Sequence, residues 1–162
     1  MGNVKYRFDR SLLKQLRDQL AGVERSLADC EELFIDIRSD VLVPSASKTF
    51  DAGGRPSTWE PLSEAYALRK ARRVGHTQVL VWSETLRDSI ASESGNQYSV
   101  WDTGPHRMLF GTEVPYAAAH QYGYAPNNLP ERPFLLIQDE DYDKILDMSM
   151  DWLMETGRYA SE

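Results

Sequence analysis

The side chains best suited to acid–base or metal chemistry are the three histidines, His76, His106 and His120. No two of them have the spacing of an HExxH helix, so a histidine metal site would have to be assembled from three separate loops. His120 follows Tyr116 by four residues on a predicted short helix, which favours a packing or hydrogen-bonding role. The histidines therefore give little support to a catalytic or metal site.

Acidic and glycine-rich segments add no stronger signal of catalysis. Glu140, Asp141 and Asp143 could be drawn as a metal cluster, but the helix dipole alone favours acidic residues at the start of a helix. The chain has no GxSxG, GxxxxGK(S/T) or GxGxxG motif, and the segment DAGGR at 51–55 is too short to cradle a phosphate. We expect no enzyme activity and no cofactor, and a metal-dependent hydrolase is the least favoured function.

One basic cluster, Arg69, Lys70, Arg72 and Arg73, could contact phosphate, although basic residues also suit the end of a helix. The net charge of −7 argues against broad binding of nucleic acid. The charge is uneven, because residues 1–75 carry 13 basic and 11 acidic side chains, whereas residues 76–162 carry 5 and 14. A nucleic-acid-contacting or capsid-associated adaptor module is kept as the alternative function.

The composition is that of an ordinary soluble protein. The 162 residues are 41% hydrophobic and 27% charged, which favours a single domain over residues 1–162. The one cysteine, Cys30, excludes an intramolecular disulfide. The N-terminal residues lack the apolar region of a signal peptide, and no apolar run approaches the roughly 20 residues that span a bilayer. We therefore expect a cytoplasmic setting and no membrane partner.

A long helical element is predicted over residues 1–44. Apolar residues recur at steps of three and four from Leu12 to Val41, with Asp9 as the predicted N-cap and Pro44 ending the pattern. Such a helix would be roughly 50 Å long, too long to be covered by a small domain. We expect either a break near Gly22 or a stretch that packs against another subunit, and a coiled-coil dimer is a less favoured alternative.

The remainder is predicted to be an extended loop followed by an α+β core. Prolines and the Gly53-Gly54 pair predict the loop over residues 45–61, and the core covers residues 62–157. The fold class is α+β, with a small, mostly antiparallel sheet and a C-terminal amphipathic helix. The predicted elements of the core are short helices at 62–73, 84–92 and 115–122, a β-hairpin at 97–102 and 107–111, a strand at 134–137 and a final helix from 139 or 140 to about 156.

The final helix has two distinct sides. Its predicted buried side consists of Tyr142, Ile145, Leu146, Trp152 and Leu153. Acidic residues recur on its other side at steps of four, and we call them the acidic stripe: Asp143, Asp147, Asp151 and Glu155. Like charges four residues apart destabilise a helix by about 0.2–0.5 kcal/mol per pair. A solvated face is the simplest interpretation of the acidic stripe, and a surface that repels a polyanion is the alternative.

Four blocks of the sequence resemble, in the same order, blocks of the Mu-like phage virion morphogenesis family, the tail-completion proteins. FDAGGRPSTWEPLSEAY at 50–66 resembles the family's GGRPxWxPLS signature. LVWSETLRDSI at 80–90 looks like its IL…tGxLrdSI block, with Glu84 where the family usually has glycine. FGTEVPYAAAHQYG at 110–123 is similar to vGt…YAxxHqfG, and LPERPFL at 129–135 is similar to iPaRPFL.

The resemblance implies a non-enzymatic structural protein of the head–tail junction, acting as a tail-completion, neck or tail-terminator protein. It implies an α+β fold and a ring of identical subunits, for which we favour a hexamer over a dodecamer. The ring would contact the tail tube, head-completion proteins or both, and DNA would only pass through it. The expected locations are the virion and, during assembly, the host cytoplasm.

A subunit or partner interface is the site expected under this resemblance, because aromatic and arginine residues are enriched at interface centres. The long helix and the loop from Phe50 to Trp59 would contact adjacent subunits or the tail tube, while 116–123 and 132–134 would brace the sheet. For Gly123 and Pro133 we prefer a role in turns and core. If subunits surround a channel, the acidic stripe would line it and repel DNA. The expected interface residues are Phe50, Arg55, Trp59, Tyr116, His120, Gln121, Arg132 and Phe134.

Overall fold

The N-terminal helical pattern forms a series of helices and not one rod. The computed structural model describes residues 10–159, so the predicted N-cap Asp9 lies outside the described residues. The helical path breaks at Asp29 and Cys30, and not near Gly22. There the Asp29 carboxylate accepts a hydrogen bond from the Glu31 amide at 3.0 Å, and the Cys30 amide donates to the Pro105 carbonyl at 2.9 Å. The elements are α1 (Arg10–Ala28), α2 (Glu31–Ile37), the π-helical turn η1 (Arg38–Leu42) and α3 (Val43–Ala52).

Pro44 does not end the helical path, and the predicted loop over 45–61 is wrong for residues 45–52, which are helical. Proline is tolerated in the first turn of α3 because its missing N–H would need no partner there. In a continuous helix that N–H would bond to the Asp40 carbonyl. Here Lys144 of the C-terminal helix donates to this carbonyl at 2.6 Å, so the loss is compensated from another element.

The loop after α3 begins at the Gly53-Gly54 pair. Gly53 has a φ of 70°, the left-handed conformation that commonly ends helices, and the Gly54 amide donates back to the Thr49 carbonyl at 2.9 Å. Gly54 has a φ of 118°, and a Cβ there would lie 2.6 Å from the Ser57 carbonyl oxygen. The backbone conformation therefore favours glycine at position 53, and position 54 requires it because a side chain has no room there.

The predicted hairpin and short helices are confirmed with shifted boundaries. The strands pair antiparallel, with Trp101 opposite Phe110. The predicted strand at 134–137 is wrong, because that segment is irregular, and the sheet of the described residues has two strands. The fold class α+β and the C-terminal helix are confirmed, although that helix continues past Gly157. These elements are α4 (Glu64–Val74), α5 (Thr85–Ala91), β1 (Ser99–Gly104), β2 (Arg107–Thr112), α6 (Ala117–Tyr122), the 3-10 turn η2 (Ala125–Asn127) and α7 (Asp139–Tyr159).

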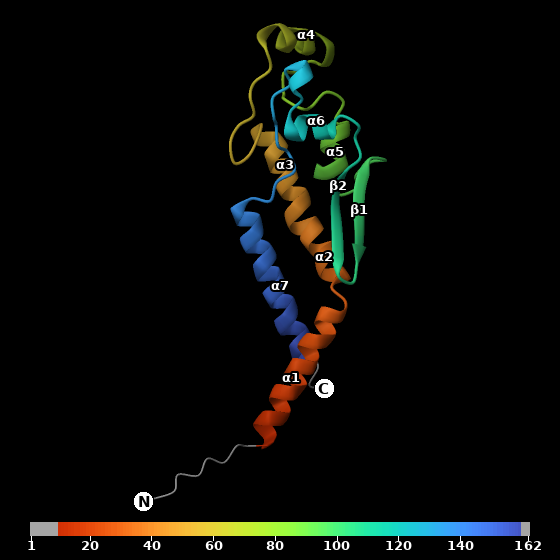
Figure 1. The fold of residues 1–162 in the computed structure, drawn as a ribbon, viewed down its shortest axis with the longest axis vertical. Coiled ribbons are helices and arrows are strands. Elements are labelled where there is room, and N and C mark those ends of the chain that lie inside the picture. Colours follow the sequence, from red (N-terminus) through yellow and green to blue (C-terminus); the bar gives the residue numbers. More distant parts are fainter. Residues whose placement is uncertain (1–9, 160–162) are drawn as a thin grey trace, which may run out of the picture.

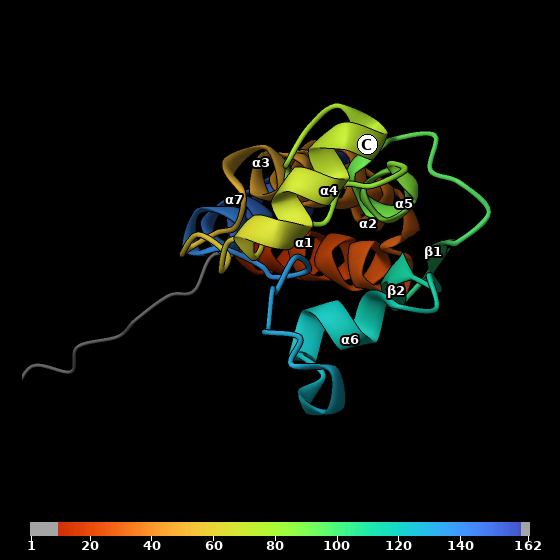
Figure 2. The ribbon, with the colours of Figure 1, turned by 90° about the horizontal axis from the view of Figure 1, so that it is seen from above.

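The molecule is elongated, with a stalk at one end and a head at the other (Figure 1). We use "stalk" for α1 and α7, which pack against each other, and "head" for the elements from α3 to η2. Seen from above, α4 lies across the end of the head and α6 lies to one side of it (Figure 2). No helix of the described residues is long and apolar enough to cross a membrane.

The hydrophobic core lies in the head. Phe50 is fully buried. The centre of its ring lies 5.6 Å from the ring centre of Trp59, in an edge-on contact, and 6.1 Å from that of Phe134. Burying each such side chain contributes about 1.5–3 kcal/mol to stability. The other buried members of this cluster are Ala46, Val81, Leu86, Ile90, Val114 and Ala117.

Candidate functional site

The aromatic residues predicted as contact residues lie inside the subunit. Phe50, Trp59 and Phe134 are 0%, 7% and 3% exposed, so within the single subunit their side chains belong to the core. Their place at an interface between subunits stays a prediction. Aromatic residues are enriched in cores as well as at interface centres, and residue type alone does not separate the two environments.

These residues also join two loops that are far apart in the sequence. The indole Nε1 of Trp59 donates to the Pro133 carbonyl at 2.7 Å, and Nε of Arg132 donates to the Glu60 carbonyl at 3.1 Å. The backbone amide of Arg132 donates to the His120 carbonyl at 2.7 Å. The first and last sequence blocks of the family resemblance therefore meet in space, where they fix the loop of 53–63 against residues 129–138.

Gln121 connects the same region to α6. Its side-chain Oε1 accepts hydrogen bonds from the amides of Phe134 and Leu135 at 3.0 and 3.1 Å, and its Nε2 donates to the Leu135 carbonyl at 3.2 Å. Without Gln121 these two backbone amides would need other hydrogen-bond acceptors, such as the carbonyls of a neighbouring strand. These bonds connect α6 directly to residues 134–135, and the bracing of the sheet by these segments stays a prediction.

The acidic residues at the start of α7 are engaged in the fold. Asp141 is buried, and its carboxylate accepts from the Ser45 hydroxyl and, at 3.0 Å, from the Gln138 amide. Glu140 forms an ion pair with Arg55, whose side chain is largely buried. No group of three histidine, cysteine or carboxylate side chains among the described residues could hold a metal ion. Arg55 therefore joins the first loop to α7.

The remaining predicted site residues meet at a groove in the head. Tyr116, His120 and Arg132 line it together with Lys70 of the basic cluster, and its volume is about 650 Å³. Tyr116 is 46% exposed, whereas Arg132 is buried. Burial and the nearby charge of Arg132 lower the pKa of His120, so its imidazole is neutral at pH 7.

The basic cluster does not form one cationic face. The side chain of Lys70 is buried and donates to the Gln78 carbonyl, while the guanidinium of Arg69 lies 4.9 Å from the centre of the Tyr66 ring. Arg72 and Arg73 are exposed at the end of α4. Burial lowers the pKa of Lys70, although the nearby charge of Glu84 opposes this effect.

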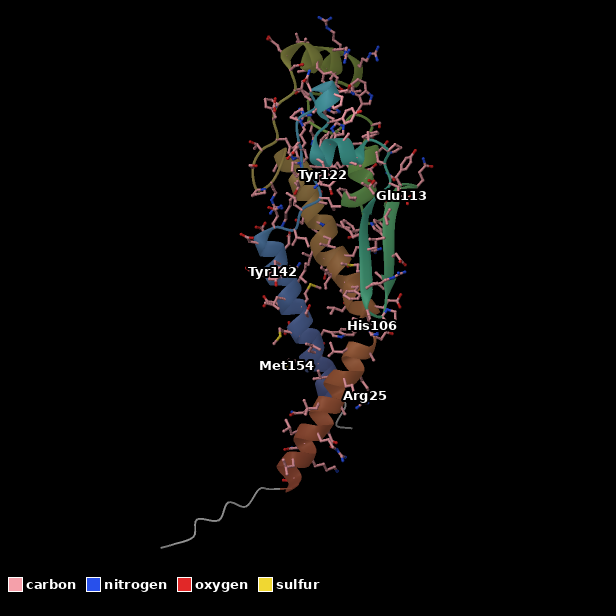
Figure 3. The ribbon with its side chains drawn as sticks, in the orientation of Figure 1. Arg25, His106, Glu113, Tyr122, Tyr142 and Met154 are labelled. Atoms are coloured by element: carbon pink, nitrogen blue, oxygen red, sulfur yellow. The ribbon has the colours of Figure 1, made fainter. Side chains whose placement is uncertain are left out.

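The stalk carries exposed apolar side chains that sequence reasoning placed in a core. Tyr142 and Leu146 were predicted to be buried but are 64% and 51% exposed, and Met150 and Met154 are 52% and 60% exposed. Together they form an apolar stripe at steps of four along α7, and Tyr142 and Met154 mark its two ends (Figure 3). The step of four was visible in the sequence, but periodicity cannot tell whether an apolar face meets its own core or another molecule.

The other helix of the stalk has the same property. Four leucines of α1 are more than half exposed although α1 packs against α7. Exposed apolar surface on this scale, flanked by charged residues, is typical of a site of protein association. The four leucines are Leu13, Leu16, Leu20 and Leu27.

The acidic stripe lies beside the apolar stripe on α7. All four of its carboxylate residues are exposed. Each follows a member of the apolar stripe by one residue, and successive residues of an α-helix are rotated by about 100°. A molecule that covers the apolar stripe can therefore leave the acidic stripe open to solvent.

Known proteins are similar to this sequence over much of its length. The model of the phage virion morphogenesis family matches residues 12–154. The Mu-like prophage FluMu G protein 2 of Haemophilus influenzae is 30% identical over 113 residues, which cover 67% of this chain and 67% of that protein. An uncharacterised protein of Methanocaldococcus jannaschii is 30% identical over 77 residues, covering 48% of this chain and 53% of that protein. No solved structure has significant similarity to this chain.

Proposed function

Because the chain belongs to the phage virion morphogenesis family, we propose that it is a structural subunit of the head–tail junction that assembles into a ring. Membership of this family gives the chain a role in the assembly of a phage virion. The ring and its position between head and tail are our proposal. The proposed role is structural, involves no catalysis and needs no cofactor.

The exposed apolar surface of the stalk is the observation that carries this proposal. Four large apolar side chains of α1 and four of α7 are each more than half exposed in the single subunit. Burying such a side chain contributes about 1.5–3 kcal/mol, so a few of them suffice for a stable contact. A ring requires two different surfaces on each subunit, and α1 and α7 each provide one.

The charge distribution supports the arrangement of the ring. A neighbour seated on the apolar stripe leaves the acidic stripe uncovered, and we propose that it lines the channel. Carboxylates on the channel wall would repel the phosphates of DNA, so that DNA passes without being retained. The tail tube and head-completion proteins are the proposed partners above and below the ring, which we propose to be a hexamer.

Genetic complementation tests the position at the head–tail junction. A phage that lacks this protein should form filled heads and separate tails, and the wild-type chain should restore joined particles in electron micrographs. The double variant Leu146→Glu/Met150→Glu should leave heads and tails apart, because it places charge on the apolar stripe. Leu109→Glu, which places charge on an exposed apolar side chain outside the stalk, is the matched control and should restore joining. Joined particles with the double variant, or a defect in head formation, would contradict the proposal.

A further inference from the structure

The groove in the head contains two buried cations that the ring does not use. It lies between the loop after α3, helices α4 and α6, and residues 127–132. Lys70 is 2% exposed and Arg132 is 5% exposed, yet both line the groove. The aromatic and apolar part of its lining comes from Tyr66, Trp82, Tyr116 and Leu129.

Neither cation is paired with a carboxylate in the described part of the chain. Lys70 donates to one backbone carbonyl, that of Gln78. The Arg132 side chain donates through Nε to another backbone carbonyl, that of Glu60, at 3.1 Å. Because both side chains are buried, their charges are poorly solvated, and this burial lowers the pKa of each group.

A buried charge without a counter-ion is costly, and a bound anion would relieve that cost. The fork of an arginine side chain matches a carboxylate with two parallel hydrogen bonds. His120 also lines the groove, and its buried Nδ1 atom has no hydrogen-bond partner within the described part of the chain. The polar part of the groove thus offers unused hydrogen-bonding capacity to a carboxylate.

The surroundings favour one negative charge over many. Glu60 lies close enough to Arg132, and Glu84 close enough to Lys70, to influence their charges. These two carboxylates would repel a polyanion such as a nucleic acid more than a ligand with a single charge. A single carboxylate between apolar groups fits this balance.

The aromatic side chains indicate a peptide as the ligand. The rings of Tyr66 and Trp82 lie 6.4 Å apart, and Trp82 and Tyr116 are 42% and 46% exposed. Tyrosine and tryptophan provide large contact area with little loss of conformational entropy, which is why binding surfaces for proteins are rich in them. A volume of about 650 Å³ lies within the range of ligand-binding clefts and can hold a few side chains.

We propose that this groove docks an extended peptide segment of a partner protein, in which one glutamate or aspartate lies between apolar side chains. The carboxylate binds Arg132 and Lys70, and the apolar side chains pack on Tyr66, Trp82 and Tyr116. This docking site is separate from the stalk, so it does not depend on the proposed ring.

An array of capped decapeptides tests the proposal with the full-length chain. Its peptides carry glutamate between varied apolar residues, and each has a counterpart with glutamine. Glutamate peptides should bind at least about tenfold more tightly than their counterparts, because a hydrogen bond to a charged group is worth about 1.5–3 kcal/mol. No binding at about 1 mM peptide, or equal binding of the two series, would overturn the proposal. Tighter binding of a single-stranded DNA oligonucleotide than of any peptide would also overturn it.

Variants of the chain locate the binding. Lys70→Gln should remove the preference for glutamate, and Lys70→Arg should retain part of it. Trp82→Ala, at an exposed position that does not threaten folding, should weaken both peptide series by at least about tenfold. Leu109→Ala, exposed on the hairpin, is the matched control and should bind like the wild type. Unchanged binding by Trp82→Ala would overturn the placement of the peptide in this groove.

Discussion

At the scale of single residues, one tryptophan explains how two sequence blocks act together. Trp59 fills the core against Phe50 and also donates its indole hydrogen bond to the Pro133 carbonyl at 2.7 Å. Residue type and spacing singled out this tryptophan, but they could not reveal its partner. The two residues are 74 positions apart, and only the folded chain brings them together.

Trp59→Phe should lower the free energy of unfolding by about 1–3 kcal/mol, since it leaves the Pro133 carbonyl without its donor. Chemical denaturation followed by circular dichroism measures this loss. Trp82→Phe is the matched control, because Trp82 is 42% exposed, and should change stability by less than about 0.5 kcal/mol. Equal losses in the two variants would contradict the assigned role of the Trp59 hydrogen bond.

His120 should make stability depend on pH. Burial and the charge of Arg132 hold its pKa below the ordinary value of 6.5, so the unfolded chain binds a proton more readily than the folded chain. The stability that comes from keeping His120 neutral is therefore fully present above pH 6.5, and it is lost as the pH falls below that value.

Denaturation curves measured at a series of pH values test this dependence. His120→Gln should reduce the loss of stability on acidification, whereas His106→Gln, on the exposed hairpin turn, should leave it unchanged. An identical pH dependence in His120→Gln and the wild-type chain would contradict the assignment.

At the scale of elements, local patterns predicted what local interactions determine. The hairpin and the short helices follow from turn residues, proline positions and periodicity, and the structure contains them. The strand at 134–137 fails because the Gln121 side chain satisfies the amides of Phe134 and Leu135, a long-range contact that no local pattern encodes. The local pattern also predicts a helix end at Pro44, because the compensating donor Lys144 lies 104 positions from the Asp40 carbonyl.

The end of α3 allows a sharp test of backbone conformation. Gly54→Ala should lower the free energy of unfolding by more than about 1 kcal/mol, because φ is 118° and the new Cβ would lie 2.6 Å from two backbone atoms. Gly104→Ala is the matched control, since nothing lies within 4 Å of its Cβ position. Thermal unfolding compares the two variants, and a similar stability for both would refute the requirement for glycine at position 54.

At the scale of the whole molecule, the sequence revealed the amphipathic helices but not which of their faces would stay uncovered. Core formation in the head uses the short helices and loops, so the stalk keeps apolar side chains on its surface. The head and the stalk thus have different properties. The head is a packed body with a groove, and the stalk offers surfaces for association.

The acidic stripe should keep the affinity of the assembled protein for DNA low. Replacing Asp143, Asp147 and Asp151 by asparagine removes three negative charges from one face of α7. Fluorescence anisotropy with duplex DNA at low salt should then show a higher affinity for the variant than for the wild type, because the variant repels the phosphates less. Strong DNA binding by the wild-type chain would contradict a channel lining that repels DNA.

Native mass spectrometry of the purified full-length chain tests the ring most directly. We expect one dominant closed oligomer with six times the subunit mass of 18.5 kDa, and its loss in the double variant Leu146→Glu/Met150→Glu. Asp147→Asn should assemble like the wild type. A wild-type chain that stays monomeric at every concentration, or a double variant that assembles as well as the wild type, would contradict assembly through the stalk.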